Sequence, residues 1–378
     1  FTIASTHSGN TVLTTSDNVD TIHIQSTAGN TVVNTGAGAD VTNVKAIGAA
    51  TTINSGADAD TINIGSTAPD ANGNVNAISA LLTVNGQDGS DTVNVNDTSD
   101  TSGNTGNLTG TALTGLGMSA GITYGTVESL NISLGSGGDT FTVASTHANN
   151  TVLNTLGGGD TVHVQTTAGV TVVNTGAGAD TANVKAISAA TTINAGAEAD
   201  TINVGSKAPD VNGNVNTISA SLTINGEDGS DVVNVDDKSD TSGNTGNLTG
   251  TALTGLGMSA GITYGTVESL NISLGSGGDT FTVASTHANN TVLNTLGGGD
   301  TVHLQTTAGV TVVNTGDGTD TTNVKAISAA TTINSGADSD TINVGSKAPN
   351  VNGNVNAISA PLTVNGEDGS DTVNVDDT

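Results

Sequence analysis

The residues best placed to do chemistry are aspartates that recur in glycine-rich turns. The motif G-x-G-x-D-x-h-x-V, where h is an aliphatic residue, occurs for example at Gly176–Val184. Glycine allows the positive φ of a tight turn, and the aspartate shares its parity with the inward-facing aliphatic residues. Its carboxylate is therefore expected to point back into the turn, where a hard cation such as Ca²⁺ finds oxygen ligands. The pattern predicts Ca²⁺ turns at Asp20, Asp40, Asp60, Asp91, Asp139, Asp160, Asp180, Asp200, Asp231, Asp279, Asp300, Asp320, Asp340 and Asp371.

Other acids crowd the same turns and are possible extra ligands. They lie two or three residues before the motif aspartate, at Asp58, Asp88, Glu198, Asp228, Asp338 and Asp368. Carboxylates stacked every ~4.8 Å repel by roughly 1 to 3 kcal/mol per neighbouring pair, so something must neutralise them. The alternative is that each aspartate caps backbone N–H groups of its own turn and needs no metal.

Two further segments have the spacing of oxygen ligands in calcium loops. Asp210, Asn212 and Asn214 alternate in PDVNGNVN, and the third copy replaces the first of them by Asn350. The segment DDKSDTSGN, residues 236–244, is similar in composition. The signal is weak, and the alternative interpretation of both segments is an Asn/Gly-rich surface loop.

No sequence signature of catalysis is present. HExxH, GxSxG and P-loop motifs are absent, as is GxGxxG in a βαβ setting. The six basic residues are all Lys, so no Arg stands beside the acids as polysaccharide-cleaving sites usually require. His163 is expected on the outward side of its strand as a solvated residue rather than a ligand or base. We predict that the protein is not an enzyme.

Composition narrows the class of partner. Lys+Arg number 6 against 35 Asp+Glu, a net charge of -29, which disfavours nucleic acid and anionic membranes. No apolar run approaches the ~20 residues of a membrane span, so no membrane insertion is expected. Aromatic residues make up 1% and Cys is absent, so the core must be thin and built from small aliphatic side chains. The first residue is Phe1, and we expect an internal segment of a longer protein.

Repeats at two scales predict the elements that position these residues. FTIASTH at residue 1 returns as FTVASTH at 141 and 281, which defines copies at 1–140, 141–280 and 281–378, the last incomplete. Within each copy, motif aspartates such as Asp160, Asp180 and Asp200 fall 20 residues apart, between segments that alternate at period 2. Stacking of such units builds an all-β parallel β-helix, or β-solenoid, with about 20 residues per coil and about fourteen or more coils. We expect the coiling to be right-handed. We also expect one continuous solenoid rather than separate globular domains.

The same register predicts columns of like residues. One inward column holds Leu153, Val173 and Ile193, and an asparagine column at Asn154, Asn174, Asn194 and Asn225 is expected to form a structural ladder of side-chain amides. Two insertions interrupt the 20-residue spacing. The longer one includes residues 239–270, which form either an extra coil or a protruding loop.

The chain resembles the tandem repeats of large secreted bacterial surface proteins of the RTX-like or adhesin type. The resemblance is carried by GITYGTVESLNISLGSGGDTFTV and the following TVVNTGAGADTANV units, and it spans the whole chain. The motif occurs once per coil, whereas RTX nonapeptides are contiguous. The resemblance implies an extracellular cell-surface fibre, sheath or adhesin stalk stiffened by Ca²⁺, with copies of itself as end-to-end or lateral partners. The alternative is a module that binds ice or a surface glycan, because T-x-N rows are expected on the outer face.

Overall fold

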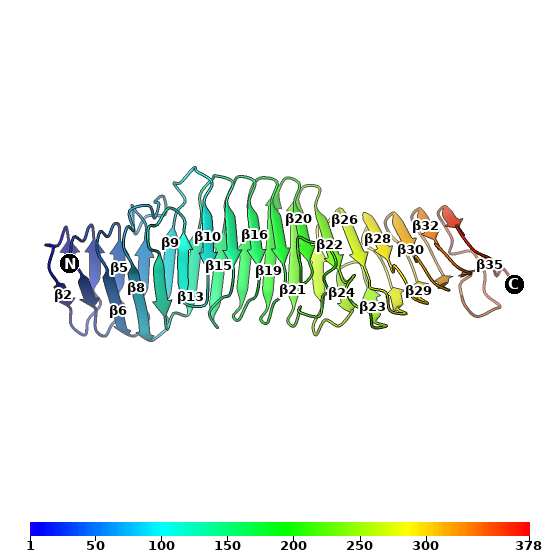
Figure 1. Cartoon of the computed structure of the whole chain (residues 1–378), viewed down its shortest axis with the longest axis horizontal. Helices are drawn as coiled ribbons and strands as arrows, with labels where there is room; N and C mark the ends of the chain where they lie inside the picture. Colours follow the sequence, from blue (N-terminus) through cyan, green and yellow to red (C-terminus); the bar gives the residue numbers. More distant parts are fainter. The chain divides into compact units, whose positions relative to one another are not determined.

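The computed structural model describes all 378 residues, and every regular element in it is a β-strand (Figure 1). Strands of mostly four or five residues recur about every ten residues, and parallel partners lie about 20 residues apart, as Thr31 and Thr51 do. These pairings confirm the predicted parallel β-solenoid and its coil length. The handedness of coiling stays a prediction. The structure contains no helix suited to crossing a membrane.

The chain forms two compact units, which are described separately. The first comprises Phe1–Ala182 and Ala189–Ala197, and the second comprises Asn183–Ser188 and Glu198–Thr378. The division into two complete copies of 140 residues and an incomplete third copy, within one continuous solenoid, stays a prediction.

In the first unit, successive coils build two sheets. One sheet pairs, in spatial order, β1 (Thr2–Ile3), β3 (Thr21–Ile24), β5 (Val41–Val44), β7 (Thr61–Ile64), β9 (Thr92–Asn96), β13 (Ser129–Ser133), β15 (Asn150–Asn154), β17 (Thr171–Asn174) and β19 (Thr191–Ala197). The other pairs β2 (Thr11–Thr14), β4 (Thr31–Asn34), β6 (Thr51–Ala57) and β8 (Leu82–Asp88), and then β12 (Ile122–Gly125), β11 (Ala112–Gly115), β10 (Thr105–Leu108), β14 (Thr140–Val143) and β16 (Thr161–Val164). Strand β18 (Thr181–Val184) is divided between the units.

The second unit repeats the plan. One sheet pairs β20 (Thr201–Val204), β22 (Val232–Asp236), β26 (Ser269–Ser273), β28 (Asn290–Asn294), β30 (Thr311–Asn314), β32 (Thr331–Asn334) and β34 (Leu362–Asn365). The other pairs β21 (Leu222–Asp228), β25 (Ile262–Gly265), β24 (Ala252–Gly255), β23 (Thr245–Leu248) and β27 (Thr280–Val283), and then β29 (Thr301–Leu304), β31 (Thr321–Val324), β33 (Thr341–Val344) and β35 (Thr372–Val375).

The core lies between the two sheets of each unit and is made of alternate residues. In β7, Ile62 and Ile64 are buried while Thr61 and Asn63 are only partly buried, as period-2 alternation requires. The inward column expected at Leu153, Val173 and Ile193 is fully buried. The largest fully buried side chain of the first unit is Phe141, whose partner in the adjacent strand is Gly106. A Cβ at Gly106 would lie 2.4 Å from the Phe141 ring, so glycine makes room for the ring.

The long insertion becomes part of the sheet. In the first unit, β10, β11 and β12 form an antiparallel meander, and β12 and β10 pair in parallel with β8 and β14. On the opposite sheet, β9 pairs directly with β13. In the second unit, β23 to β25 take the equivalent place between β21 and β27. The insertion is therefore neither a protruding loop nor an ordinary parallel coil.

This arrangement moves equivalent strands to opposite sheets in successive copies. We call each crossing of one sheet by the chain a pass. Strands β1 to β9 and β13 are one pass each and alternate between the sheets, and the three strands of the meander together form one pass. Each complete copy therefore makes an odd number of passes. In the second unit, β20 pairs with β22, whereas its equivalent one copy later, β33, belongs to the sheet of β31 and β35. Identical surface features of successive copies thus face opposite ways.

We expect antibody decoration to reveal this alternation. An epitope tag inserted after Asp210 and another after Asn350 lie in exposed loops, beside Val211 and Val351, which are 60% and 71% exposed. Fab fragments bound to the doubly tagged chain should project from opposite faces in negative-stain electron microscopy. Chains with a single tag serve as controls and should carry one Fab. Two Fabs on the same face would contradict the odd number of passes.

Candidate functional site

The fourteen predicted aspartates form regular columns at the entrances to strands. Each immediately precedes a strand, and the twelve from Asp40 to Asp340 are at most 3% exposed. Where the bond is resolved, the carboxylate Oδ1 accepts the backbone N–H of the motif residue in the preceding coil. The N···Oδ1 distance is 2.7 Å from Asp20 to Asp40 and 3.1 Å from Asp340 to Asp371. The inward orientation expected from sequence is confirmed.

The aspartates cap backbone N–H groups, as the metal-free alternative expected, but the N–H groups belong to a different turn. Capping was expected within the turn that carries the aspartate, but Asp320 Oδ1 accepts from Asp300, 20 residues earlier and one coil away. The carboxylate therefore joins successive turns along the stack. When the carboxylate is ionised, this bond is charge-assisted and stronger than a neutral one.

Sequence reasoning missed the residues that end and begin each column. Glu128 Oε2 accepts the N–H of Asp91 at 2.8 Å, so glutamate continues the column in the coil of the meander. The next column starts where Asn104 donates its N–H to Asp139 Oδ1 at 2.7 Å. Glu268 and Asn244 repeat this in the second unit. A signal was present, because Glu128-Ser-Leu-Asn-Ile matches Asp60-Thr-Ile-Asn-Ile position by position.

Burial leaves the second carboxylate oxygen without a partner. Oδ2 of thirteen of the motif aspartates is buried and makes no hydrogen bond. Burial raises the pKa of Asp60 and of Asp320 to about 7, although the N–H from the preceding coil opposes the rise and neighbouring acids add to it. The pKa of Asp279 rises to about 6 for the same reasons. Asp60, Asp279 and Asp320 therefore hold their protons to higher pH than an exposed carboxyl does.

The folded side chains do not gather into a cage for Ca²⁺. Calcium takes 6–8 oxygen ligands, whereas each turn supplies one buried carboxylate with a single oxygen uncommitted. No group of three or more His, Cys, Asp or Glu side chains is placed to hold a metal ion. The six possible extra ligands, Asp58, Asp88, Glu198, Asp228, Asp338 and Asp368, are exposed rather than turned inward with the motif aspartates. Calcium binding at the turns stays a prediction.

The two loop-like segments tie the insertions to each other. In the second copy, Asp210 and Asn212 are exposed, and Asn214 contacts Ser239 through a side-chain bond of 3.2 Å. Asp237, fully buried, accepts the N–H of Val215 at 3.0 Å, and burial raises its pKa to about 7. These segments thus have a structural role in fixing the shorter insertion against residues 236–244.

Histidines occupy two kinds of position. His23 and His303 contact Asn43 and Asn323 through their Nδ1 atoms, at the head of an outer asparagine ladder. His147 was not singled out by sequence; its ring meets Tyr124 edge-on with centroids 5.8 Å apart, and burial lowers its pKa. The pair packs the meander against the next coil, and Tyr264 and His287 repeat it.

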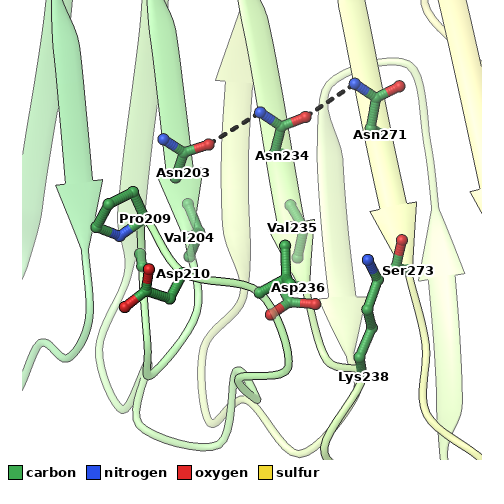
Figure 2. Close-up of a pocket in the computed structure, with 12 residues that line it drawn as sticks. Asn203, Val204, Pro209, Asp210, Asn234, Val235, Asp236, Lys238, Asn271 and Ser273 are labelled. Carbon is green, nitrogen blue, oxygen red and sulfur yellow. Dashed lines mark hydrogen bonds between the residues drawn. The ribbon is translucent and has the colours of Figure 1, made fainter.

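A groove of about 430 Å³ lies on the outer face of the sheet that contains β20, β22 and β26 (Figure 2). Its floor is a ladder of amides, in which Asn234 and Asn271 each donate Nδ2–H at 2.9 Å to the Oδ1 of the preceding asparagine. Figure 2 shows Pro209 toward the Asn203 side, Asp236 below Asn234, and Lys238 and Ser273 below Asn271. Val211 also lines the groove. A second groove, of about 520 Å³, occupies the equivalent place in the third copy, over Asn343 and Asn374.

The buried acids predict an unusual pH dependence of stability. A carboxyl with a pKa near 7 when folded and 3.8 when unfolded holds its proton more tightly in the folded state, so stability falls as pH rises from about 4 to 7. In chelator, Asp320→Asn should melt at about the wild-type temperature at pH 4 and above it at pH 8. His147, His287 and His303, whose pKa values burial lowers, act in the opposite sense and are common to both chains.

The control is Asp240→Asn, because a hydrogen bond from the Ser242 N–H lowers the pKa of Asp240. Its melting-temperature difference from wild type should stay constant between pH 5 and 8. The measurement is thermal unfolding followed by circular dichroism. A pH-independent difference for Asp320→Asn would show that its carboxyl is not desolvated.

No protein-family model matches this chain, and no curated protein matches it in sequence. The functional argument therefore depends on the geometry of the columns, ladders and grooves.

Proposed function

We propose that the protein is a structural component of an extracellular, cell-surface fibre, sheath or adhesin stalk, in which stacked coils form a stiff rod. The observation that carries this proposal is that neighbouring coils are joined at three separate places around the coil. Main-chain ladders join the strands, asparagine amides join the outer faces, and aspartate carboxylates join the turns. Each net hydrogen bond contributes about 1 kcal/mol, and bending a stack must strain all three sets together.

The repeated chemistry supports a structural rather than an enzymatic role. Asp40, Asp60 and Asp91 make the same backbone contact in successive coils, so no one of them is distinguished as an acid, base or nucleophile. Copies of the chain itself, end to end or laterally, are the proposed partners, because a strand edge left open at the end of any stack of coils can pair with another strand. The net charge of -29 disfavours nucleic acid as a partner. The extracellular location follows from the resemblance to bacterial surface-protein repeats.

Stiffness is tested by the dimensions of longer arrays. Chains with two, four and eight copies of residues 141–280 should form particles of constant width and of length proportional to copy number in electron microscopy. A matched array with a Gly/Ser linker inserted between copies should bend at each linker, which shows that the assay detects hinges. Arrays that bend at every copy without a linker would contradict the rod.

Calcium stiffening is a separate part of the proposal. If Ca²⁺ enters the turns, it engages the unpartnered Oδ2 atoms, and the ionised carboxylates it holds cease to repel one another. Thermal unfolding with Ca²⁺ should then shift upward relative to chelator, most strongly at pH 8 where Asp60 and Asp320 are ionised. Mg²⁺ at the same ionic strength is the control. Equal melting temperatures with Ca²⁺ and chelator would leave the carboxylates as backbone caps alone.

A further inference from the structure

We propose that the amide-floored groove of the second copy, and its equivalent in the third, bind a neutral polyhydroxylated chain, an oligosaccharide. The proposal goes beyond the rod and does not depend on it. It rests on the hydrogen-bonding capacity of the floor, on the side walls and on what differs between the copies.

The floor offers donors and acceptors in alternation. A carboxamide has two N–H donors and two acceptor lone pairs. Within the ladder, Asn234 uses one N–H toward Asn203 and one lone pair toward Asn271. One donor and one acceptor per residue are left, repeated at the ~4.8 Å spacing of the strands. Hydroxyl groups, which both donate and accept, are the ligand groups that match such a row.

The rest of the groove suits a sugar ring. Pro209 and Val211 line the groove with apolar surface, as the C–H face of a sugar requires. Ser273 adds a hydroxyl near Asn271. The volumes of about 430 and 520 Å³ fall within the range of small-ligand sites.

Comparison of the copies indicates a neutral ligand. The floor asparagines and the wall proline recur in all three copies, as Asn94, Asn234 and Asn374 and as Pro69, Pro209 and Pro349. The charged positions vary: Asp210 is Asn350 in the third copy, and Lys238 corresponds to Thr98 in the first.

The charges in and around the groove do not favour a charged ligand. Asp236 Oδ2 already accepts the N–H of Gly213 at 2.6 Å, and Asp376 accepts that of Gly353 in the third copy. An anionic ligand would meet a chain of net charge -29. A cationic partner would depend on acids that one copy or another lacks.

The odd number of passes places the two grooves on opposite outer faces of the second unit. The first lies over β20, β22 and β26, and the other over β33 and β35, which belong to the opposite sheet. A chain that binds in both grooves holds one glycan on each face and can bridge two glycan layers.

Titration calorimetry of the full chain tests the proposal, with neutral hexasaccharides of glucose, mannose and galactose as probes. Hexagalacturonate and hexalysine serve as the anionic and cationic comparisons. At least one neutral hexasaccharide should bind, and the doubly substituted chain Val211→Arg, Val351→Arg should bind two fewer molecules. Both valines are more than half exposed, so the long side chains can lie across the grooves without disturbing the core.

Two controls separate groove occlusion from general effects. Val310→Arg adds the same charge at an exposed valine outside the grooves, and Asn314→Ala breaks an amide ladder in β30 away from them. Neither should change the number of molecules bound. Binding of hexagalacturonate or hexalysine alone, no binding of any neutral probe, or unchanged stoichiometry in the doubly substituted chain would each overturn the proposal. None of these results bears on the stiffness of the rod.

Discussion

The hydrogen bond from one motif residue's N–H to the carboxylate of the next coil is the constraint on which the turns depend. It holds successive turns at a fixed separation and fixes where each following strand begins. It also requires close approach of the backbones: Gly176 has φ +97°, and a Cβ there would lie 2.1 Å from the carbonyl oxygen of Leu156. Glycine is needed in these turns because the aspartate bond draws them together.

The same bond creates an electrostatic difficulty that the fold limits. Stacked carboxylates repel, and burial strengthens their interaction, so the chain benefits from proton retention and from short columns. In the first unit, the column that begins at Asp20 ends at Glu128 before β13, and the next begins at Asp139 before β14 of the other sheet. The change of sheet from one copy to the next therefore divides the line of like charges into shorter columns.

Much of this architecture was predictable because it repeats. The coil length, the inward aspartates and the asparagine ladder followed from the 20-residue spacing and period-2 alternation. The antiparallel meander did not, since alternation is the same in parallel and antiparallel strands. The acceptor role of Asp320 toward the neighbouring coil was missed because a turn's own N–H groups are equally near in sequence. Glu128 lies outside a motif defined by aspartate and glycine, although the longer acid makes the same backbone contact at the same position.

The asparagine ladders connect the structural and binding roles. Asn203, Asn234 and Asn271 hold one another in place, so the floor of the groove is ordered before any ligand arrives. A preorganised floor loses little side-chain entropy on binding, which favours affinity from few contacts. The amide hydrogen bonds that stiffen the stack thus also order the groove floor for ligand binding. Because the stack depends on the amides and not on the charges at the rim, those charges can change from copy to copy while the floor stays the same.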